Sequence, residues 1–463
     1  MSGRLTIVRA ELNATLVDID IADGIIERIA PHGGARPART EQFDANGGAV
    51  LPGLHDHHLH LLAMAAAARS VQAGPPHVVN AAQLATALRR ASTSLAPDEW
   101  IRAVGYHAVV AGDIDAAWLD QLDIARPIRV QHRSGALWIL NSLALRAVGL
   151  GDHPTGRLYR MDDWLRSRVP RQTLNLAAIG DQLVSYGITG VTDLTPSTVA
   201  EELGALAAAV SAGHLPLKVI ITGAASLPAS AEPTVPRGPA KIVIDDHHLP
   251  TLEWVFEQFR LARSTLRTVA VHCVTREALV LALVAWHEVG ALSGDRIEHG
   301  AIIPRELFSE IAALGLTVVT QPSFVYERGD QYLVDVEALD QQDLWRCRSL
   351  LEAGIGVAFG SDAPYGSADP WTMIGNAMHR RTANGTRLGV SETVEGETAL
   401  RQLLGSAEQP CIPRSIKIGA PADLCILDRV LDEQLSYPTS DAVVATIVAG
   451  HIVFEDKERK FAR

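Results

Sequence analysis

Four histidines lie within six residues in the segment His55-Asp56-His57-His58-Leu59-His60. Side chains alternate between the two faces of an extended backbone, so His58 and His60 point the same way and their imidazoles can share one metal ion. Imidazole binds zinc, iron, nickel and copper. The pattern alone is weak, because a chain with 17 histidines in 463 residues contains a His-x-His pair by chance in roughly half of cases. The metal hypothesis therefore depends on what else the chain supplies.

Further residues suited to metal chemistry stand near the ends of apolar, strand-like runs: Lys241, His272, His299 and Asp362. A two-metal hydrolytic site needs mostly neutral imidazoles, one or two carboxylates and a bridging ligand. Taken singly, each residue has a simpler explanation. Either histidine could be a hydrogen-bonded core residue, Asp362 could cap a helix, and Lys241 could pair with a nearby aspartate. Their joint occurrence along one series of strands favours the metal site.

The elements that would position these residues alternate between strands and helices. Eight apolar runs are predicted as strands: the His-rich segment and residues 187–193, 217–221, 241–245, 268–272, 296–299, 316–321 and 357–362. Amphipathic stretches at 252–264, 276–289 and 304–314 are predicted as helices between them. This alternation implies a parallel sheet with helical crossovers, and eight strands are the number of a (β/α)8 barrel, whose active site lies at the strand C-termini.

The two ends of the chain have a different sequence pattern. Short strand-like runs, punctuated by glycine and proline, fill the first fifty residues and recur at 422–428 and 442–454. This predicts a composite β-sandwich domain formed by residues 1–50 and 405–463. The barrel would then occupy 51–404, with an elaborated insertion at about 61–185, because that stretch is too long for one crossover.

The composition indicates a globular protein without a nucleic-acid or membrane partner. The formal net charge is −12, and no lysine/arginine cluster provides the basic patch that nucleic acid requires. The chain shows neither a run of eighteen apolar residues nor a secretory pattern near Met1. The four cysteines (Cys273, Cys347, Cys411 and Cys425) form no C-x-x-C motif, which is typical of buried thiols in a reducing compartment. A cytoplasmic location is the resulting prediction.

Together these motifs resemble the amidohydrolase superfamily, and within it the branch of YtcJ-like and N-substituted formamide deformylase-like proteins (amidohydrolase family 3). Matching segments are spread through nearly the whole chain, at 51–60, 129–149, 187–193, 321–324, 354–364 and 419–424. The run Gly360-Ser361-Asp362-Ala363-Pro364 and the His-x-His start are specific in combination. The resemblance implies an α/β fold, a (β/α)8 TIM-like barrel with a small β-sandwich domain, and a metal-dependent amidohydrolase.

The resemblance implies six metal ligands: His58, His60, Lys241, His272, His299 and Asp362. The first pair would bind one divalent ion together with the aspartate, and the other two histidines would bind a second. Lys241 matches a position that is carboxylated in related proteins, where the carbamate bridges both ions. The implied cofactor is one or two divalent ions, zinc first, with Co²⁺, Mn²⁺ or Fe²⁺ as alternatives.

The implied reaction is hydrolysis of a C–N bond in an amide, carbamate or urea-like small molecule. Metal ions lower the pKa of a bound water from about 15.7 towards neutrality, and Asp362 would act as general base and acid. His55 and His57 match no ligand position and are predicted to be structural. Candidate substrate contacts are His132, Arg133, Tyr159, Tyr326 and Trp371. Core packing or a solvated loop is the alternative explanation for each of them.

Departures from the family pattern leave other functions open. The family often has Asp-Gly-His where this chain has Ser134-Gly135-Ala136, which changes a polar substrate contact. A mononuclear deaminase would usually carry glutamate at the position of Thr275. The same activated water could hydrolyse a thiocarbamate, ester or lactone, and a non-catalytic binding protein of this fold would usually have lost ligands. Family habit alone suggests a homodimer.

Overall fold

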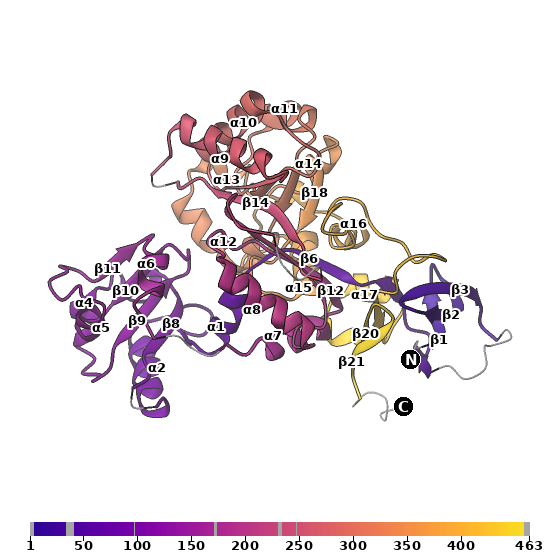
Figure 1. The fold of residues 1–463 in the computed structure, drawn as a ribbon, viewed down its shortest axis with the longest axis horizontal. Coiled ribbons are helices and arrows are strands. Elements are labelled where there is room, and N and C mark those ends of the chain that lie inside the picture. Colours follow the sequence, from indigo (N-terminus) through magenta and orange to yellow (C-terminus); the bar gives the residue numbers. More distant parts are fainter. Residues whose placement is uncertain are drawn as a thin grey trace. The chain divides into compact units, whose positions relative to one another are not determined.

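A computed structural model describes residues 4–33, 41–96, 98–170, 174–229, 234–246 and 248–457 (Figure 1). The chain divides into two compact units. One unit is Met1–Leu61 together with Leu176–Arg463, and the other is Leu62–Asn175. The first unit contains a barrel and a sandwich, and the second contains a separate five-stranded sheet.

The barrel is one sheet of eight parallel strands in the order β18-β17-β16-β15-β14-β13-β12-β6. The strands are β6 (Leu54–Leu59), β12 (Ile188–Asp193), β13 (Lys218–Gly223), β14 (Arg237–Val243), β15 (Val269–Cys273), β16 (Arg296–His299), β17 (Thr317–Thr320) and β18 (Gly356–Phe359). The ring closes just beyond β18, where Asp362 N–H donates to the His58 carbonyl at 2.7 Å and His60 N–H donates to the Ala363 carbonyl at 2.8 Å. Most residues of these strands are buried, as is expected of parallel strands flanked by helices.

Helices connect and cover these strands. They are α7 (Leu176–Ser185), α8 (Ala200–Ser211), α9 (Leu252–Ser264), α10 (Arg276–Val289), η1 (Arg305–Leu307), α11 (Phe308–Ala313), α12 (Ser323–Asp335), α13 (Ala338–Gln341), α14 (Arg348–Glu352), α15 (Pro370–His379), η2 (Val390–Glu392) and α16 (Gly396–Arg401). Three of them begin at side-chain caps, with Thr251 before α9, Thr275 before α10 and Asp369 before α15. Each cap satisfies backbone N–H groups that the first helical turn leaves without partners.

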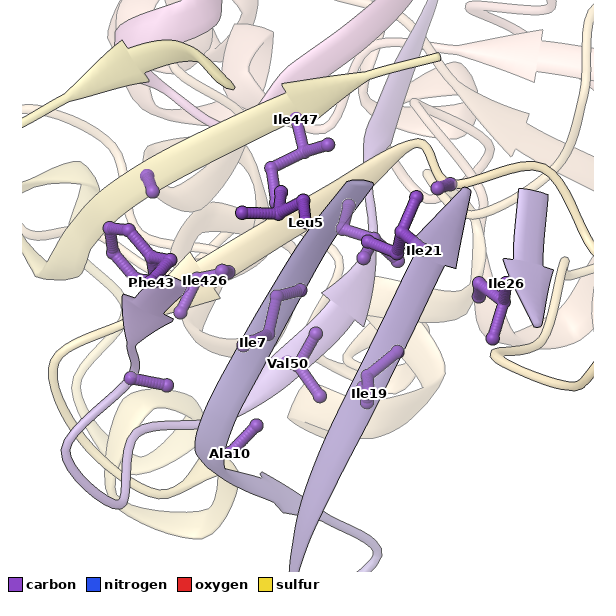
Figure 2. Packing of buried hydrophobic residues seen from close by; sticks show 14 of the residues in the cluster. Leu5, Ile7, Ala10, Ile19, Ile21, Ile26, Phe43, Val50, Ile426 and Ile447 are labelled. Atoms are coloured by element: carbon purple, nitrogen blue, oxygen red, sulfur yellow. The ribbon is translucent and has the colours of Figure 1, made fainter. Parts of the chain in front are cut away.

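The sandwich is built from both ends of the chain. One sheet has the order β3-β2-β1-β4 and the other β21-β20-β19-β5. The strands are β1 (Arg4–Leu12), β2 (Thr15–Ala22), β3 (Ile25–Pro31), β4 (Glu41–Asp44), β5 (Val50–Pro52), β19 (Leu424–Leu427), β20 (Val443–Val448) and β21 (His451–Glu455), and η3 (Ser440–Ala442) and α17 (Leu431–Ser436) lie between β19 and β20. Figure 2 shows Leu5 of the first sheet beside Ile447 of the second, and both belong to one buried cluster with Ile19 and Ile426. Burial of these side chains from segments more than 400 residues apart joins the two ends.

The chain passes from the sandwich into the barrel at Gly53. Leu51 pairs with Cys425 in the sandwich, whereas His55 pairs with Gly190 in the barrel. A Cβ on Gly53 would stand 2.1 Å from the side chain of Thr189, so only glycine fits between the two sheets. The close packing at Gly53 therefore fixes the path of the backbone two residues before His55, the first histidine of the strand.

The unit Leu62–Asn175 has its own sheet, in the order β11-β10-β9-β8-β7. Its elements are β7 (Val71–Gln72), α2 (Ala81–Ser94), β8 (Ile101–Tyr106), α3 (Ala108–Ala111), α4 (Ala116–Asp120), β9 (Ile128–His132), β10 (Leu137–Leu140), α5 (Ser142–Ala147), β11 (Arg157–Tyr159) and α6 (Asp162–Arg166), and α1 (Leu61–Ala68) begins at the unit boundary. Leu84 and Leu88 of α2 belong to the same buried cluster as Ile101 and Val130 of the sheet. This core makes the segment compact in its own right.

The predicted fold class is confirmed: the protein is α/β, with a (β/α)8 barrel and a small β-sandwich. All eight predicted barrel strands are present. Two strands differ from their expected bounds by more than two residues: the strand expected at 357–362 is Gly356–Phe359, and the strand expected at 241–245 is Arg237–Val243. Its first residue pairs with Ile221 of β13, and its pairing with β15 ends at Val243. No helix in the described part of the chain combines the length and apolar composition needed to cross a bilayer. The domain boundaries stay a prediction.

Candidate metal centre

His58 and His60 lie at the C-terminal end of β6, at the rim of the barrel. The strand ends at Leu59, and His60 directly follows it. The two ring centroids are 5.4 Å apart. His58 is buried and His60 is half-buried. The side-by-side placement expected from strand periodicity is therefore present in the structure.

Asp362 reaches the two histidines from the end of β18. The hydrogen bond from its N–H to the His58 carbonyl requires β6 and the segment after β18 to approach closely. A Cβ on Gly360 would stand only 2.5 Å from the Cβ of His58. Oδ1 of Asp362 lies 3.0 Å from Nε2 of His60 and 3.5 Å from Nε2 of His58. One possible ligand atom from each residue lies within 4.8 Å of the others. The three side chains could therefore hold one ion.

His299 and His272 extend this cluster from strands across the barrel. The centroid of the His299 ring is 4.7 Å from that of His58 and 4.4 Å from that of His272. His299 has φ 70° and Asp362 has φ 54°. Residues other than glycine rarely adopt such left-handed conformations, and those that do concentrate at functional sites. The side chains of both residues lie next to that of His58.

Lys241 lies on β14, next to the strand that carries His272. Its side chain is buried, and within the described part of the chain its Nζ has no hydrogen-bond partner. Burial lowers the pKa of this ammonium to about 8, although the nearby charges of Glu298 and Asp362 oppose the shift. A buried amine without a partner is costly. Such a position is suited to chemical modification or to contact with a bound group.

Two residues that sequence reasoning missed hold the histidine rings. Oε2 of Glu298 lies 2.6 Å from Nδ1 of His58, and Oε1 of Gln321 lies 2.9 Å from Nδ1 of His299. An acceptor at Nδ1 favours the Nδ1–H tautomer and leaves the Nε2 lone pair for a metal ion. The alternation of Arg296 and Glu298 in the buried strand β16 was the available signal, because buried charges need partners.

The protonation states suit metal binding. Burial lowers the pKa of His58 to about 4 and the pKa of His299 to about 3, so both imidazoles are neutral at pH 7, as ligands must be. Burial alone would raise the pKa of Asp362. The hydrogen bond with His60 and the neighbouring imidazoles outweigh it, and the pKa of this carboxyl lies well below its usual range.

His55 and His57 lie apart from the three-residue cluster. Nε2 of His55 is 2.9 Å from Oγ1 of Thr192, and the His57 ring stacks on His55 with centroids 4.5 Å apart. Both side chains are buried, and burial lowers the pKa of each well below its ordinary value. They are neutral packing residues of β6, in keeping with the structural role expected for them.

Three of the expected substrate contacts belong to the unit Leu62–Asn175. His132 ends β9, with its Nδ1 2.8 Å from Oγ of Ser134 and its ring beside that of His107. The Arg133 N–H donates to the carbonyl of Tyr106. Tyr159 ends β11. Their part in substrate binding stays a prediction.

The other two expected contacts, Tyr326 and Trp371, lie in the barrel unit and differ in exposure. Tyr326, on α12, is 47% exposed. Trp371, on α15, is fully buried, and its indole N–H donates to the carbonyl of Tyr186 at 3.1 Å. Trp371 therefore packs within the barrel wall and offers no exposed surface to a substrate.

The donor set fits a divalent ion. Imidazole nitrogens and a carboxylate oxygen are the ligands of catalytic zinc sites, and His58, His60 and Asp362 supply them from two adjoining strands. Their outer partners are in place, with Glu298 at one ring and Thr195 at 3.1 Å from Nδ1 of the other. The cluster is therefore a candidate metal centre at the end of the barrel where such enzymes carry their active sites.

Comparison with known sequences identifies the family. Residues 41–454 match the sequence model of the amidohydrolase family. The chain belongs to the amidohydrolase family. This amidohydrolase is 24% identical over 472 residues to N-substituted formamide deformylase from Arthrobacter pascens, covering 86% of each chain. It is also 24% identical over 450 residues to the putative amidohydrolase YtcJ from Bacillus subtilis (strain 168), covering 82% of this chain and 84% of that protein.

Comparison with solved structures agrees on the fold. The amidohydrolase superposes on an uncharacterized metal-dependent hydrolase from Pyrococcus horikoshii with a TM-score of 0.72 at 18% identity. The match covers 93% of this chain and 98% of the other. The resemblance inferred from the motifs and the expectation of a metal-dependent amidohydrolase are both confirmed at the level of the family.

Proposed function

We propose that this amidohydrolase hydrolyses a C–N bond of an amide, carbamate or urea-like small molecule. The observation that carries the proposal is the convergence of His58, His60 and Asp362 at the barrel rim, with their ligand atoms within 4.8 Å of one another. Similarity to a protein named N-substituted formamide deformylase supports N-substituted amides, formamides included, as the first substrates to test.

The proposed centre holds one or two divalent ions, with zinc as the first candidate. His58, His60 and Asp362 would bind one ion, and His272 and His299 a second. Lys241 would bridge them as a carbamate, because an ammonium has no lone pair to donate. The buried Nζ without a partner among the described residues supports this assignment. Such ions supply a water of lowered pKa and polarise the substrate carbonyl.

Asp362 would move the proton. Its carboxylate takes one proton from the attacking water as the water oxygen adds to the carbonyl carbon. The same carboxyl returns that proton to the leaving nitrogen as the C–N bond breaks, so an amide would give a carboxylic acid and an amine. General acid–base catalysis of this kind contributes about 10²- to 10⁴-fold in rate. Oδ1 lies 3.0 Å from Nε2 of His60, so the carboxylate stands beside the atoms that would bind the ion.

The test combines metal analysis with a substrate panel. The purified protein should contain up to two divalent ions per chain, and after loading with Zn²⁺ it should hydrolyse at least one N-acyl, N-formyl, carbamate or urea compound. Matched thiocarbamates, esters and lactones in the same panel test the alternative reaction on the same site. A fully folded, active protein that holds no metal would refute the proposal.

A variant pair makes the metal measurement specific. Replacing His58 and His60 together with Asn should remove at least one equivalent of zinc and abolish turnover. The control is His287→Asn, since the side chain of this histidine on α10 is 58% exposed and its Nε2 lies 2.8 Å from Oε1 of Glu310. Equal zinc content in both variants would place the metal elsewhere.

A further inference from the structure

A buried ion pair lies inside the barrel beneath the candidate metal centre. Glu298 and Arg296 are two residues apart on β16, and both side chains are almost completely inaccessible to solvent. Nε of Arg296 donates to Oε1 of Glu298 at 2.6 Å. The other carboxylate oxygen, Oε2, lies 2.6 Å from Nδ1 of His58. One carboxylate therefore joins a buried cation to a metal-ligand candidate.

These contacts cross the interior of the barrel. In the sheet order, β17 and β18 separate β16 from β6 on the shorter way round the ring. Side chains of β16 can meet His58 on β6 only by reaching across the enclosed space. Arg296 adds a second crossing contact, because its Nη2 donates to the carbonyl of His57 at 2.9 Å. The pair holds both the backbone and the ring of the His58 segment.

We propose that Glu298 is a positioning residue for the metal centre, a role that rests on the proposed function. Its carboxylate accepts the Nδ1 proton of His58 and so selects the tautomer whose lone pair is on Nε2. That nitrogen is the one facing Oδ1 of Asp362, at 3.5 Å. A carboxylate hydrogen-bonded to a ligating histidine fixes the ring and makes it a stronger donor.

The second histidine acceptor differs in charge. Nδ1 of His299 faces the neutral amide oxygen of Gln321 at 2.9 Å. A carboxylate raises the basicity of an imidazole more than an amide oxygen does. His58 should therefore donate its Nε2 lone pair to a metal ion more strongly than His299 does. The first equivalent of zinc should occupy the site that includes His58.

A simpler role for Glu298 is to neutralise Arg296, because an unpaired buried charge is costly. Two double variants separate the explanations. Arg296→Met with Glu298→Gln and Arg296→Met with Glu298→Leu both remove both charges and both lose the contact to the His57 carbonyl. With Arg296 removed, the amide oxygen of Gln can accept the Nδ1 proton of His58, whereas Leu cannot. Circular dichroism and melting of the metal-free proteins establish that both variants fold.

The measured quantity is zinc affinity, by competition with a chromophoric chelator, supported by the absorption spectrum of the Co²⁺-loaded proteins. The Leu double variant should bind zinc about 10- to 100-fold more weakly than the Gln double variant, the usual effect of removing an outer-shell acceptor. Equal affinities would overturn the positioning role and leave Glu298 as a counter-ion. Absence of zinc binding by the unmodified protein would instead refute the proposed function itself.

A measurement on the unmodified protein keeps the test independent of variant folding. Nitrogen-15 spectra of histidine-labelled, metal-free protein report which ring nitrogen carries the proton, and His58→Asn identifies the resonance. We expect the proton of His58 on Nδ1. The single variant Glu298→Gln should move it to Nε2, because Arg296 attracts the amide oxygen and turns the amide N–H₂ towards the ring. A proton on Nε2 in the unmodified protein would contradict the proposal.

Discussion

The backbone N–H of Asp362 donates to the carbonyl oxygen of His58 at 2.7 Å. This bond joins the last strand of the barrel to the first. Through the main chain, the same bond also fixes the position of Asp362, the proposed general base, relative to His58, a proposed metal ligand. The contact that closes the barrel therefore also brings together the residues of the candidate metal centre.

Gly360 should be essential to this closure. A Cβ there would lie 2.5 Å from Cβ and 2.6 Å from N of His58, so Gly360→Ala must push the two strands apart. We expect the free energy of unfolding to fall by about 1–3 kcal/mol, the usual cost of overpacking, and zinc affinity to fall with it. Urea unfolding and chelator competition measure the two effects.

Gly375→Ala is the matched control for this substitution. Gly375 lies within α15, and a Cβ there would meet nothing within 4 Å. Alanine inside a helix should stabilise the protein by about 0.5–1 kcal/mol relative to glycine and leave zinc binding unchanged. Wild-type stability and zinc affinity in Gly360→Ala would show that close strand approach does not hold Asp362 in place.

Asp362→Asn should separate proton transfer from metal binding. The amide keeps an oxygen at the ligand position but accepts no proton, so kcat should fall by about 10²- to 10⁴-fold while most of the zinc is retained. Asp369→Asn is the control, because asparagine caps a helix as well as aspartate does and Asp369 caps α15. Full turnover by Asp362→Asn would remove this residue from the mechanism.

Local pattern was enough to predict much of this protein. The two-residue period of a strand placed His58 and His60 together, and apolar runs located all eight barrel strands. These features depend on neighbours in the sequence. Conversely, the link between Glu298 and His58 spans 240 residues and crosses the barrel interior, so it depends on strand order around the ring, which periodicity does not encode.

The exposure of aromatic residues was equally hard to predict. Trp371 and Tyr326 were both plausible substrate contacts from the sequence, yet the first is fully buried and the second is 47% exposed. Each lies in the first turn of a helix that follows a barrel strand. The orientation of that helix decides which side chain is buried against the barrel. Helix orientation is set by packing against the sheet, not by the local sequence.

Glu392 should make stability depend on pH. It is buried, with Oε1 2.8 Å from Nη1 of Arg346 and Oε2 accepting the N–H groups of Cys347 and Ser349. Burial opposes ionisation, but these bonds outweigh it and lower the pKa of the carboxyl below its ordinary value of 4.5. Its stabilisation is therefore present above pH 4.5 and is lost as pH falls towards the lower, folded-state pKa.

Glu392→Gln should consequently cost about 3–5 kcal/mol near pH 7, as breaking a buried ion pair does, and less at pH 4. Urea unfolding at the two pH values measures the difference. The control is Glu352→Gln, since Glu352 is 59% exposed in its pair with Arg348 and should change stability by less than about 1 kcal/mol. An equal loss at both pH values would argue against an ionised Glu392 as the source.

Lys241→Ala tests whether the lysine acts as a carbamate. The ammonium of Lys241 would lose one proton to give the amine, which would add to CO₂ and lose a second proton, so that a cation becomes an anion with two oxygens. If that anion bridges the metal ions, removing the side chain should lower both turnover and metal content, and added formate or acetate should restore part of each by supplying a free carboxylate. Methylammonium should restore neither. The exposed Lys417→Ala should need no rescue, and recovery with methylammonium alone would show that the amine itself is the functional form.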